Sequence, residues 1–373
     1  MQQNELSTMQ QQATKAPYVT IIVSLLETAP LDKKAALLLT KKAIQEADDF
    51  LQNMYPNEAA SLLESLQALL DEFDQHYDLT AEGLGLYVSP GYSKLVKFFF
   101  PVQKKINIGD AFAVRELLYL EHYAISYMVL HVDEKAAHIY KGQFNSLEEI
   151  NDGVFPRLLH DDYEYSKPAR ASFHSGNASV QGFEGDKSTN EATRIKDFYR
   201  KTDHLLSNYL RDQPLIVVGP QKDISMVKEV SSHQKNIIAS INGNYTNVAV
   251  KMLEDRVWPV LRSWIDQGQQ STMLQLIQEE WQQHAVDGMK NVWAAVRESN
   301  GYKLIVEKDY TCPAFIDDKT GKLYLKGTKK AQHIITDAVD EVLRLAIEKG
   351  GEIVFVNNGA LEDHGHISLI TRY

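Results

Sequence analysis

The chain has 373 residues, more than one ordinary hydrophobic core holds, so its length predicts two or three domains. Hydrophobic residues make up 44% of it and charged residues 24%, as in an ordinary globular protein. The formal net charge of −11 excludes a freestanding, non-specific nucleic-acid binder, because affinity for phosphates depends on Lys and Arg. It still permits one local basic surface on an otherwise acidic protein.

The N-terminus and the cysteine content predict a cytoplasmic protein. Residues 1–16 are Gln-rich and polar, so we expect a disordered lead and no secretory signal. No apolar run approaches the roughly 20 residues that cross a bilayer, so we expect no membrane partner. The single cysteine, Cys312, excludes an internal disulfide framework and is typical of a reducing compartment. We expect it to be a small buried or half-buried residue and not a nucleophile.

Residues 17–121 have the pattern of a first α/β domain. The apolar, β-branched run Tyr18–Leu26 predicts a buried strand. Apolar residues at helical spacing predict a helix from about Lys33 and a second helix after it. Two further strands, Gly83–Val88 and Ser93–Phe100, are joined by a Ser-Pro-Gly turn. Nothing in this part carries a chemical motif.

Residues 122–247 predict a second α/β domain. Ala124–Val132 and Ala136–Tyr140 form a hairpin pattern around an Asp-Glu-Lys turn. After a loop and a helix, Leu215–Gly219 is a short buried strand that ends in glycine. A further helix and a strand at Ile237–Ile241 complete the domain.

Residues 248–373 predict a third domain, which is helical before it becomes a sheet. One apolar stripe runs from Val250 to Trp264, another begins at Leu274, and a third helix has apolar positions from Ile335 to Ile347. Gly350-Gly351 is a helix C-cap signal, and strands follow at Glu352–Val356 and His366–Tyr373. The predicted fold class is therefore α/β, with three α/β domains.

A polar loop that leads into an amphipathic helix, Ser166–Arg211, is the stretch with a functional interpretation. The loop Ser166–Phe183 has no acidic residue, and Ser188-Thr-Asn-Glu191 is a capping box that predicts the helix start. An ordinary solvated surface is the alternative. The candidates for RNA contact are Lys167, Arg170, Phe173, His174, Gln181 and Gly182 in the loop and Arg194, Arg200 and Lys201 on the helix.

The C-terminal sequence resembles a known family. Gly350-Gly-Glu-Ile-Val-Phe-Val-Asn-Asn-Gly-Ala-Leu361 and His364-Gly-His-Ile-Ser-Leu-Ile-Thr-Arg-Tyr373 resemble the last domain of archaeal and eukaryotic peptide release factors and Pelota. The hairpin, loop, basic-faced helix and Val-x-Gly strand of the middle part are similar to their second domain. The Leu84-x-x-Tyr-Val-Ser-Pro-Gly91 hairpin resembles the first domain of the bacterial archaeo-eukaryotic release factors.

This resemblance implies a three-domain architecture and a role in translation near the ribosomal A site. It also implies the ribosome, ribosomal RNA and a translational GTPase as partners. We expect no cofactor. Release factors carry Gly-Gly-Gln at the tip of the second-domain loop, whereas this chain has Val180 before Gln181-Gly182. A β-branched residue cannot easily take the backbone conformations open to glycine. We therefore expect a rescue, quality-control or hibernation-type factor without peptidyl-tRNA hydrolysis, with Gln181 as the sole catalytic candidate.

Other functions stay open at this point. One alternative is a divergent peptidyl-tRNA hydrolase, or a nuclease that uses the acidic groups at 148–152 and 161–164. The other is a protein-interaction module of the same architecture. His364 and His366 lie beside Glu362 and Asp363, but a third metal ligand at a recognisable spacing is missing, so we expect no metal site.

Overall fold

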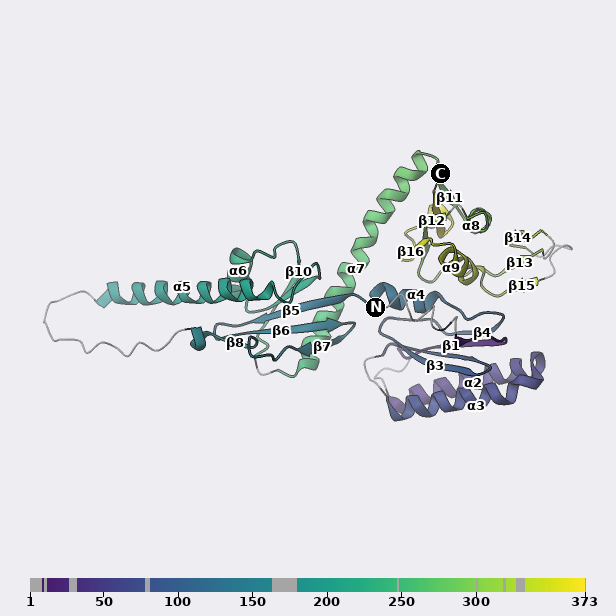
Figure 1. Cartoon of the computed structure of the whole chain (residues 1–373), viewed down its shortest axis with the longest axis horizontal. Helices are drawn as coiled ribbons and strands as arrows, with labels where there is room; N and C mark the ends of the chain where they lie inside the picture. Colours follow the sequence, from purple (N-terminus) through teal and green to yellow (C-terminus); the bar gives the residue numbers. More distant parts are fainter. Residues whose placement is uncertain are drawn as a thin grey trace. The chain divides into compact units, whose positions relative to one another are not determined.

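The computed structural model describes residue 9 and residues 12–26, 32–77, 81–162, 180–246, 248–299, 301–317, 320–326 and 333–372, without the side chains of 161–162, 180–191, 269–270 and 333–334. It divides into two compact units, one of Met1–Tyr123 with Ile265–Tyr373 and the other of Ala124–Trp264. Helices and several sheets occur in both (Figure 1), which confirms the predicted α/β class. None of the described helices combines the length and the apolar character needed to cross a membrane.

The first part of unit one is a four-stranded sheet covered by two helices. The strands have the order β3-β2-β1-β4, and β1 pairs antiparallel with both β2 and β4. The elements are β1 (Tyr18–Ser24), α2 (Lys33–Met54), α3 (Pro56–Gln75), β2 (Gly83–Ser89), β3 (Tyr92–Phe98), β4 (Lys105–Gly109) and α4 (Arg115–Tyr123). The predicted strands and helices of this part are confirmed, and β4 was not predicted.

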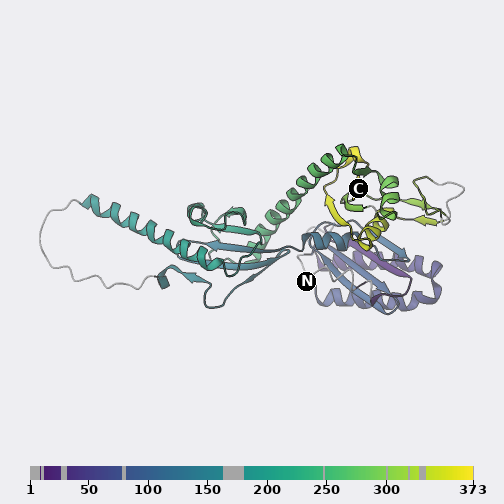
Figure 2. The same cartoon turned by 45° about the horizontal axis from the view of Figure 1, so that its top comes forward.

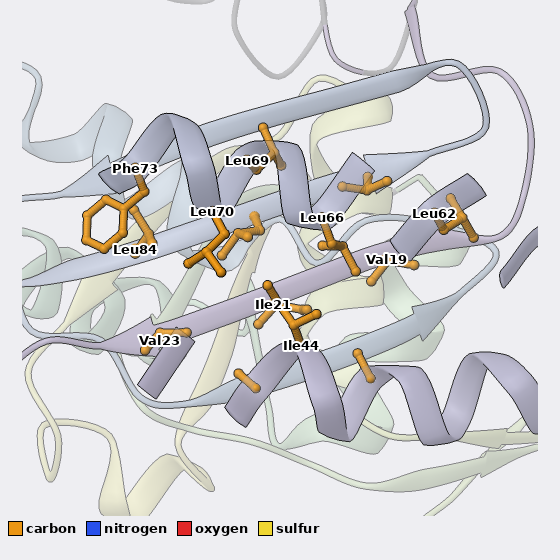
Figure 3. Close-up of a cluster of buried hydrophobic side chains, with 14 of the residues drawn as sticks. Val19, Ile21, Val23, Ile44, Leu62, Leu66, Leu69, Leu70, Phe73 and Leu84 are labelled. Carbon is orange, nitrogen blue, oxygen red and sulfur yellow. The ribbon is translucent and has the colours of Figure 1, made fainter. Parts of the chain in front are cut away.

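One core joins α2 and α3 to one face of this sheet. Figure 3 shows Ile21 of β1 between Ile44 of α2 and Leu66 of α3. The helical periodicity of α2 and α3 places their apolar residues on the side that faces the sheet, and Ile21, Ile44 and Leu66 are all buried there. The Asp32 carboxylate caps α2 by accepting from the Lys34 backbone N–H, and Pro56 begins α3, where its missing N–H costs nothing.

The second part of unit one contains two small sheets with helices. A sheet of order β11-β17-β12-β16 is accompanied by a three-stranded sheet of order β14-β13-β15. The elements are the end of α7 (Val250–Trp281), β11 (Ala285–Asp287), α8 (Met289–Arg297), β12 (Gly301–Glu307), β13 (Ala314–Ile316), β14 (Leu323–Tyr324), β15 (His333–Ile335), α9 (Ala338–Glu348), β16 (Glu352–Val356), η2 (Glu362–His364) and β17 (Ile367–Thr371).

Two predictions for this part were wrong in detail. The apolar stripes near Val250 and Leu274 belong to one helix, α7, which continues through Pro259. Ile335 lies in β15 and not in a helix, because α9 begins only after Asp337, whose carboxylate accepts from the Val339 backbone N–H as an N-cap. The C-cap prediction is confirmed at Gly350-Gly351: Gly350 has φ +72°, and the Gly351 N–H donates to the last turn of α9.

The three-domain division predicted at 121 and 247 stays a prediction. Residues 17–121 and 248–373 each carry sheets of their own, while the structure groups Met1–Tyr123 and Ile265–Tyr373 in one compact unit.

Unit two, drawn from blue through teal to green in Figure 2, is a mixed sheet with helices α5 and α6 packed in one core against it. Its main strand order is β10-β9-β5-β6-β7, with β9 parallel to β5 and β10 and with β8 beside β6. The elements are β5 (Ser126–Val132), β6 (Ala136–Gln143), β7 (Ser146–Glu149), β8 (Arg157–Leu158), η1 (Leu159–Asp162), α5 (Val180–Leu206), β9 (Leu215–Gly219), α6 (Gln221–Val230), β10 (Ile237–Asn242) and the start of α7.

Glycine is required at the end of β9. A Cβ built on Gly219 would lie 2.2 Å from the Val132 carbonyl oxygen on the neighbouring strand β5. No side chain fits at that distance without a shift of the backbone. The Val-x-Gly pattern read from the sequence therefore marks the closest approach of two central strands.

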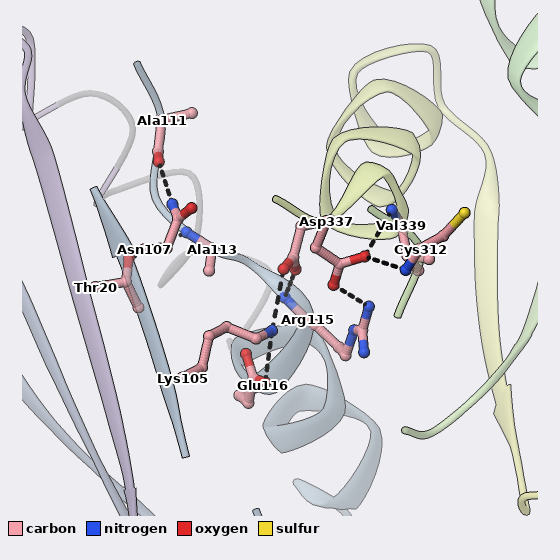
Figure 4. Close-up of polar contacts among 11 residues, drawn as sticks. Thr20, Lys105, Asn107, Ala111, Ala113, Arg115, Glu116, Cys312, Asp337 and Val339 are labelled. Carbon is pink, nitrogen blue, oxygen red and sulfur yellow. Dashed lines mark hydrogen bonds and ion pairs between the residues drawn. The ribbon is translucent and has the colours of Figure 1, made fainter. Parts of the chain in front are cut away.

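A buried group of opposite charges joins the two parts of unit one (Figure 4). The Arg115 guanidinium lies 2.5 Å from the Asp337 carboxylate, and Lys105 lies 2.9 Å from Glu116 and 3.0 Å from Asp340. Burial alone would raise the pKa of Asp340, but the nearby Lys105 and Arg115 charges outweigh it and hold that pKa below its usual value.

Asp337 also orders the backbone beside this group. Its other oxygen accepts the Cys312 backbone N–H at 3.0 Å and caps α9. Cys312 is buried, as predicted, and burial raises the pKa of its thiol, which disfavours the nucleophilic thiolate.

Removing the Arg115 side chain tests how much this buried group of charges contributes to the free energy of unfolding. Loss of one partner leaves a buried carboxylate without its counter-charge, so Arg115→Ala should lower the free energy of unfolding by about 3–5 kcal/mol. Arg200→Ala, which removes an exposed ion pair on α5, should cost less than about 1 kcal/mol. Urea unfolding followed by tryptophan fluorescence measures both. Similar midpoints for the two variants would contradict the assignment.

A second buried carboxylate fastens the end of α5 to the turn after α6. Asp203 accepts hydrogen bonds from the Ser231 hydroxyl at 2.6 Å, from the Ser232 hydroxyl and backbone N–H at 2.7 and 2.8 Å, and faces His233 Nδ1 at 3.0 Å. Burial acts to raise the pKa of Asp203, but these partners outweigh it and hold the pKa below its usual value.

Asp203→Asn should therefore destabilise unit two in a pH-dependent way. At pH 7 we expect a loss of about 1–3 kcal/mol, because the amide cannot accept the same set of hydrogen bonds. Since the folded-state pKa lies below the unfolded value, the carboxylate's contribution is present above about pH 4 and is lost as the pH falls through the folded-state pKa. Urea unfolding at pH 7 and pH 3 measures the difference. A deficit that is equal at both pH values would refute this account.

Candidate nucleic-acid interface

Helix α5 begins at Val180, eight residues before the predicted capping box at Ser188-Thr-Asn-Glu191. The predicted helix start is therefore wrong. A Ser followed three residues later by Glu is also accommodated inside a helix, so the signature fixes no boundary when the preceding residues are helical too. Gln181 and Gly182 consequently lie in the first turn of α5, where the structure describes their backbone.

The inner face of α5 is firmly anchored on the sheet of unit two. Ile195, Phe198 and Leu206 are buried at helical spacing, as predicted. The Tyr199 hydroxyl bonds to the Asp133 carbonyl oxygen at 3.0 Å and the Asp223 carboxylate at 2.9 Å. This combination fixes both the rotation and the position of the helix along the sheet.

The outer face of α5 carries the basic candidates. Arg194, Arg200 and Lys201 are all exposed, and Arg194 and Lys201 are seven residues apart, so they share one face. Arg200 pairs with Asp197 at 2.5 Å, and both side chains remain about half exposed, at 62% and 46%. Exposed pairs of this kind are worth little, so a phosphate oxygen can replace the carboxylate.

Two other lysines of helices α5 and α6 are paired with acidic residues. Lys196 pairs with Glu229 of α6 at 2.5 Å, and Lys222 of α6 pairs with Glu134 at 2.9 Å. The other candidates, Lys167, Arg170, Phe173 and His174, lie outside the described residues. Of the predicted set, the structure therefore describes the side chains of the three helix residues, Arg194, Arg200 and Lys201, and all three are exposed.

The acidic groups considered for a nuclease have structural roles where they are described. Glu149 lies 2.7 Å from His138 Nδ1. Asp152 accepts the backbone N–H groups of Val154 and Phe155 and the Tyr209 hydroxyl. These contacts close a turn and a strand edge, whereas the side chains of 161–164 lie outside the described part of the chain. The described acidic side chains of this stretch do not converge on one point.

Ser207, His233 and Asp203 have the connectivity of a hydrolase triad. Ser207 Oγ lies 3.2 Å from His233 Nε2, and His233 Nδ1 faces Asp203. However, Ser207 follows the last residue of α5, where the helix dipole is negative and opposes a developing oxyanion. The hydroxyls of Ser231 and Ser232 also donate hydrogen bonds to the Asp203 carboxylate, which is therefore not dedicated to His233. We assign this group a structural role at the end of α5.

Sequence reasoning missed one further cluster, in unit one. His364 does not meet its neighbours Glu362 and Asp363 but faces Glu280 at 3.0 Å and Asp287 at 2.9 Å. His366 separately faces Glu307 at 2.9 Å. No spacing in the sequence reveals these partners, because they come from α7 and β11 and meet the C-terminal loop only in the folded sheet.

Solved structures with some likeness to this chain are translation factors. Pelota of Archaeoglobus fulgidus is 15% identical, with 78% of this chain and 79% of that chain covered and a TM-score of 0.39. S. cerevisiae Dom34, a translation termination-like factor, is 12% identical over 80% and 82%, with a TM-score of 0.34. An archaeal translation termination factor is 13% identical over 99% and 96%, with a TM-score of 0.25.

At these identities and TM-scores the likeness carries no argument about what this chain does. No curated protein matches the chain. A sequence family does, and its match takes in the sheet of unit two, helices α5 and α6, all of α7, β11 and α8. Residues 126–300 match Bacterial archaeo-eukaryotic release factor family 3, and the resemblance predicted from the sequence is confirmed over that segment.

Proposed function

We propose that this protein is a release-factor-like translation factor that binds the ribosome near the A site and contacts ribosomal RNA through α5. One observation carries the proposal: the family match covers the unit in which α5 is anchored on one face and presents Arg194, Arg200 and Lys201 on the other. A rigid helix with a basic outer face can approach a phosphate backbone without rearranging the sheet beneath it.

The contact we propose is electrostatic in the first place. Arg200 would exchange the Asp197 carboxylate for a phosphate oxygen, a substitution between two exposed partners of similar geometry. The residues before α5 would extend the surface, with Lys167, Arg170 and His174 near phosphates and Phe173 available to stack on an exposed base. With a net charge of −11, the rest of the chain would not hold RNA by itself.

The proposed role is one without peptidyl-tRNA hydrolysis. The chain has no Gly-Gly-Gln, and Gln181 follows Val180 at the very start of α5. In release factors two glycines precede the Gln and give the backbone conformations that other residues avoid. Here the backbone of Gln181 is helical and no glycine pair precedes it, so we do not expect it to reach a peptidyl-tRNA ester in that way. The protein would then be a rescue, quality-control or hibernation-type factor of the cytoplasm that acts with a translational GTPase.

The α5 surface is tested by changing its three described basic residues together. Arg194→Ala, Arg200→Ala and Lys201→Ala in one variant should weaken co-sedimentation with ribosomes and reduce its salt dependence. The log–log slope should fall by roughly one unit for each phosphate that the variant no longer neutralises. The fold should survive, because exposed substitutions usually cost within about 0.5 kcal/mol each.

The matched control carries the same loss of charge on a different helix. Lys34, Lys41 and Lys42 are exposed on α2, and their triple Ala variant should bind ribosomes like the parent. If the two triple variants bind alike, or if the parent does not bind at all, α5 is ordinary surface and the interaction-module alternative gains support.

The absence of hydrolysis has its own test. Ribosomes that carry peptidyl-tRNA, with or without a stop codon in the A site, should release no more peptide with this protein than in buffer. Release well above the buffer rate that disappears in Gln181→Ala would show a divergent hydrolase and reject this part of the proposal.

A further inference from the structure

Three metal-binding types of side chain meet at one point of unit one. Glu280 belongs to the last turn of α7, Asp287 ends β11, and His364 ends η2. One nitrogen or oxygen atom of each lies within 4.8 Å of the other two. Because the three residues come from separate elements, their convergence is a product of the fold and not of a local charge run.

The fold holds two of these residues in place by backbone contacts. Asp287 pairs with Ser368 in the β11–β17 ladder, and the Gly288 N–H, one residue on, donates to the carbonyl oxygens of His364 at 3.1 Å and Ile367 at 2.9 Å. Gly365 has φ +66°, and a Cβ there would lie 3.2 Å from Gly288 Cα. The loop that carries His364 is therefore fastened directly to the end of β11.

The hydrogen bonds of the cluster are shared unequally. His364 Nδ1 faces carboxylate oxygens of both Glu280 and Asp287, although one N–H can be aimed fully at one of them only. The second Asp287 oxygen accepts from the Ser368 hydroxyl, which orients the carboxylate as an outer-shell partner does in metal sites. The side chains are 17%, 31% and 32% exposed for His364, Asp287 and Glu280, so an ion can enter from solvent.

From this geometry we propose that Glu280, Asp287 and His364 form a binding site for a divalent transition-metal cation, with Zn²⁺ as the first choice and Mn²⁺ as the second. Imidazole nitrogen with two carboxylate oxygens is a donor set that both ions accept. Two carboxylates and a neutral imidazole also balance the charge of one divalent cation. Three protein ligands leave a fourth position of a tetrahedral ion open to water or to a ligand.

Binding of Zn²⁺ requires only a small change in the distances between the ligand atoms. Tetrahedral ligands at about 2.0–2.2 Å from Zn²⁺ lie roughly 3.4 Å apart. The His364 nitrogen is now 2.9 and 3.0 Å from its two carboxylate partners, so each of these distances must open by a few tenths of an ångström. Glu280 lies in the last turn of α7, and its side chain has one more rotatable bond than that of Asp287 with which to make this movement.

The experiment is titration of the full-length, EDTA-stripped protein with ZnCl₂ and MnCl₂ by isothermal calorimetry. The parent should bind one ion per chain, and Glu280→Gln and His364→Ala should each weaken that binding at least tenfold. His366→Ala is the matched control. His366 is two residues from His364 in the sequence but faces a single carboxylate, that of Glu307, so this variant should bind the ion like the parent. Circular dichroism in EDTA verifies that all variants are folded.

Two further readings separate a built site from adventitious binding by surface histidines. Co²⁺ should give visible absorption bands of a four-coordinate ion in the parent and in His366→Ala but not in His364→Ala. Trp281, next to Glu280 and 88% exposed, should lose fluorescence to Co²⁺ only when the site is intact. No binding by the parent, or equal binding by the parent and Glu280→Gln, would overturn the proposal and leave His364 as an ion-pair partner alone. Neither result depends on ribosome binding.

Discussion

The buried charges around Arg115 are the constraint on which unit one depends. Two segments that are far apart in the sequence each bring charges that water no longer solvates, and the desolvation cost is repaid only where each charge meets its partner. Arg115 and Lys105 come from one segment, and Asp337 and Asp340 come from the start of α9 in the other. Since Asp337 also caps α9, the same side chain holds the start of that helix and binds it to the first segment.

In unit two, too, buried polar side chains fix one element on another, here helix α5 on the sheet. Tyr199 and Asp203, two buried polar side chains of α5, are each satisfied by neighbouring elements, so the inner face of the helix has one fit to the sheet. What remains on the outer face is Arg194, Arg200 and Lys201, where the described ion pair of Arg200 is exposed, weak and free to exchange. The function we propose uses this contrast between a fixed inner face and an adaptable outer one.

Local patterns in the sequence predicted most elements, because strands such as β1 and helices such as α2 show their periodicity directly. They failed at β11, which has three residues, and at β4, whose five residues include only two apolar ones and which is a strand because it pairs with β1. They also failed at the start of α5, since a capping signature does not exclude helix before it. For the site, Arg194 and Lys201 were predictable from helical spacing, whereas Glu280 and Asp287 beside His364 were not, because long-range β pairing brings them together.

The central claim, binding near the ribosomal A site, is tested most directly by competition with aminoacyl-tRNA. Ribosomes with a defined codon in an empty A site are incubated with fluorescently labelled protein, and bound label is measured as cognate aminoacyl-tRNA is delivered. The account predicts that filling the A site displaces the protein in proportion to tRNA occupancy, and that tRNA in the P site does not. Binding that persists unchanged on ribosomes with a filled A site would contradict it.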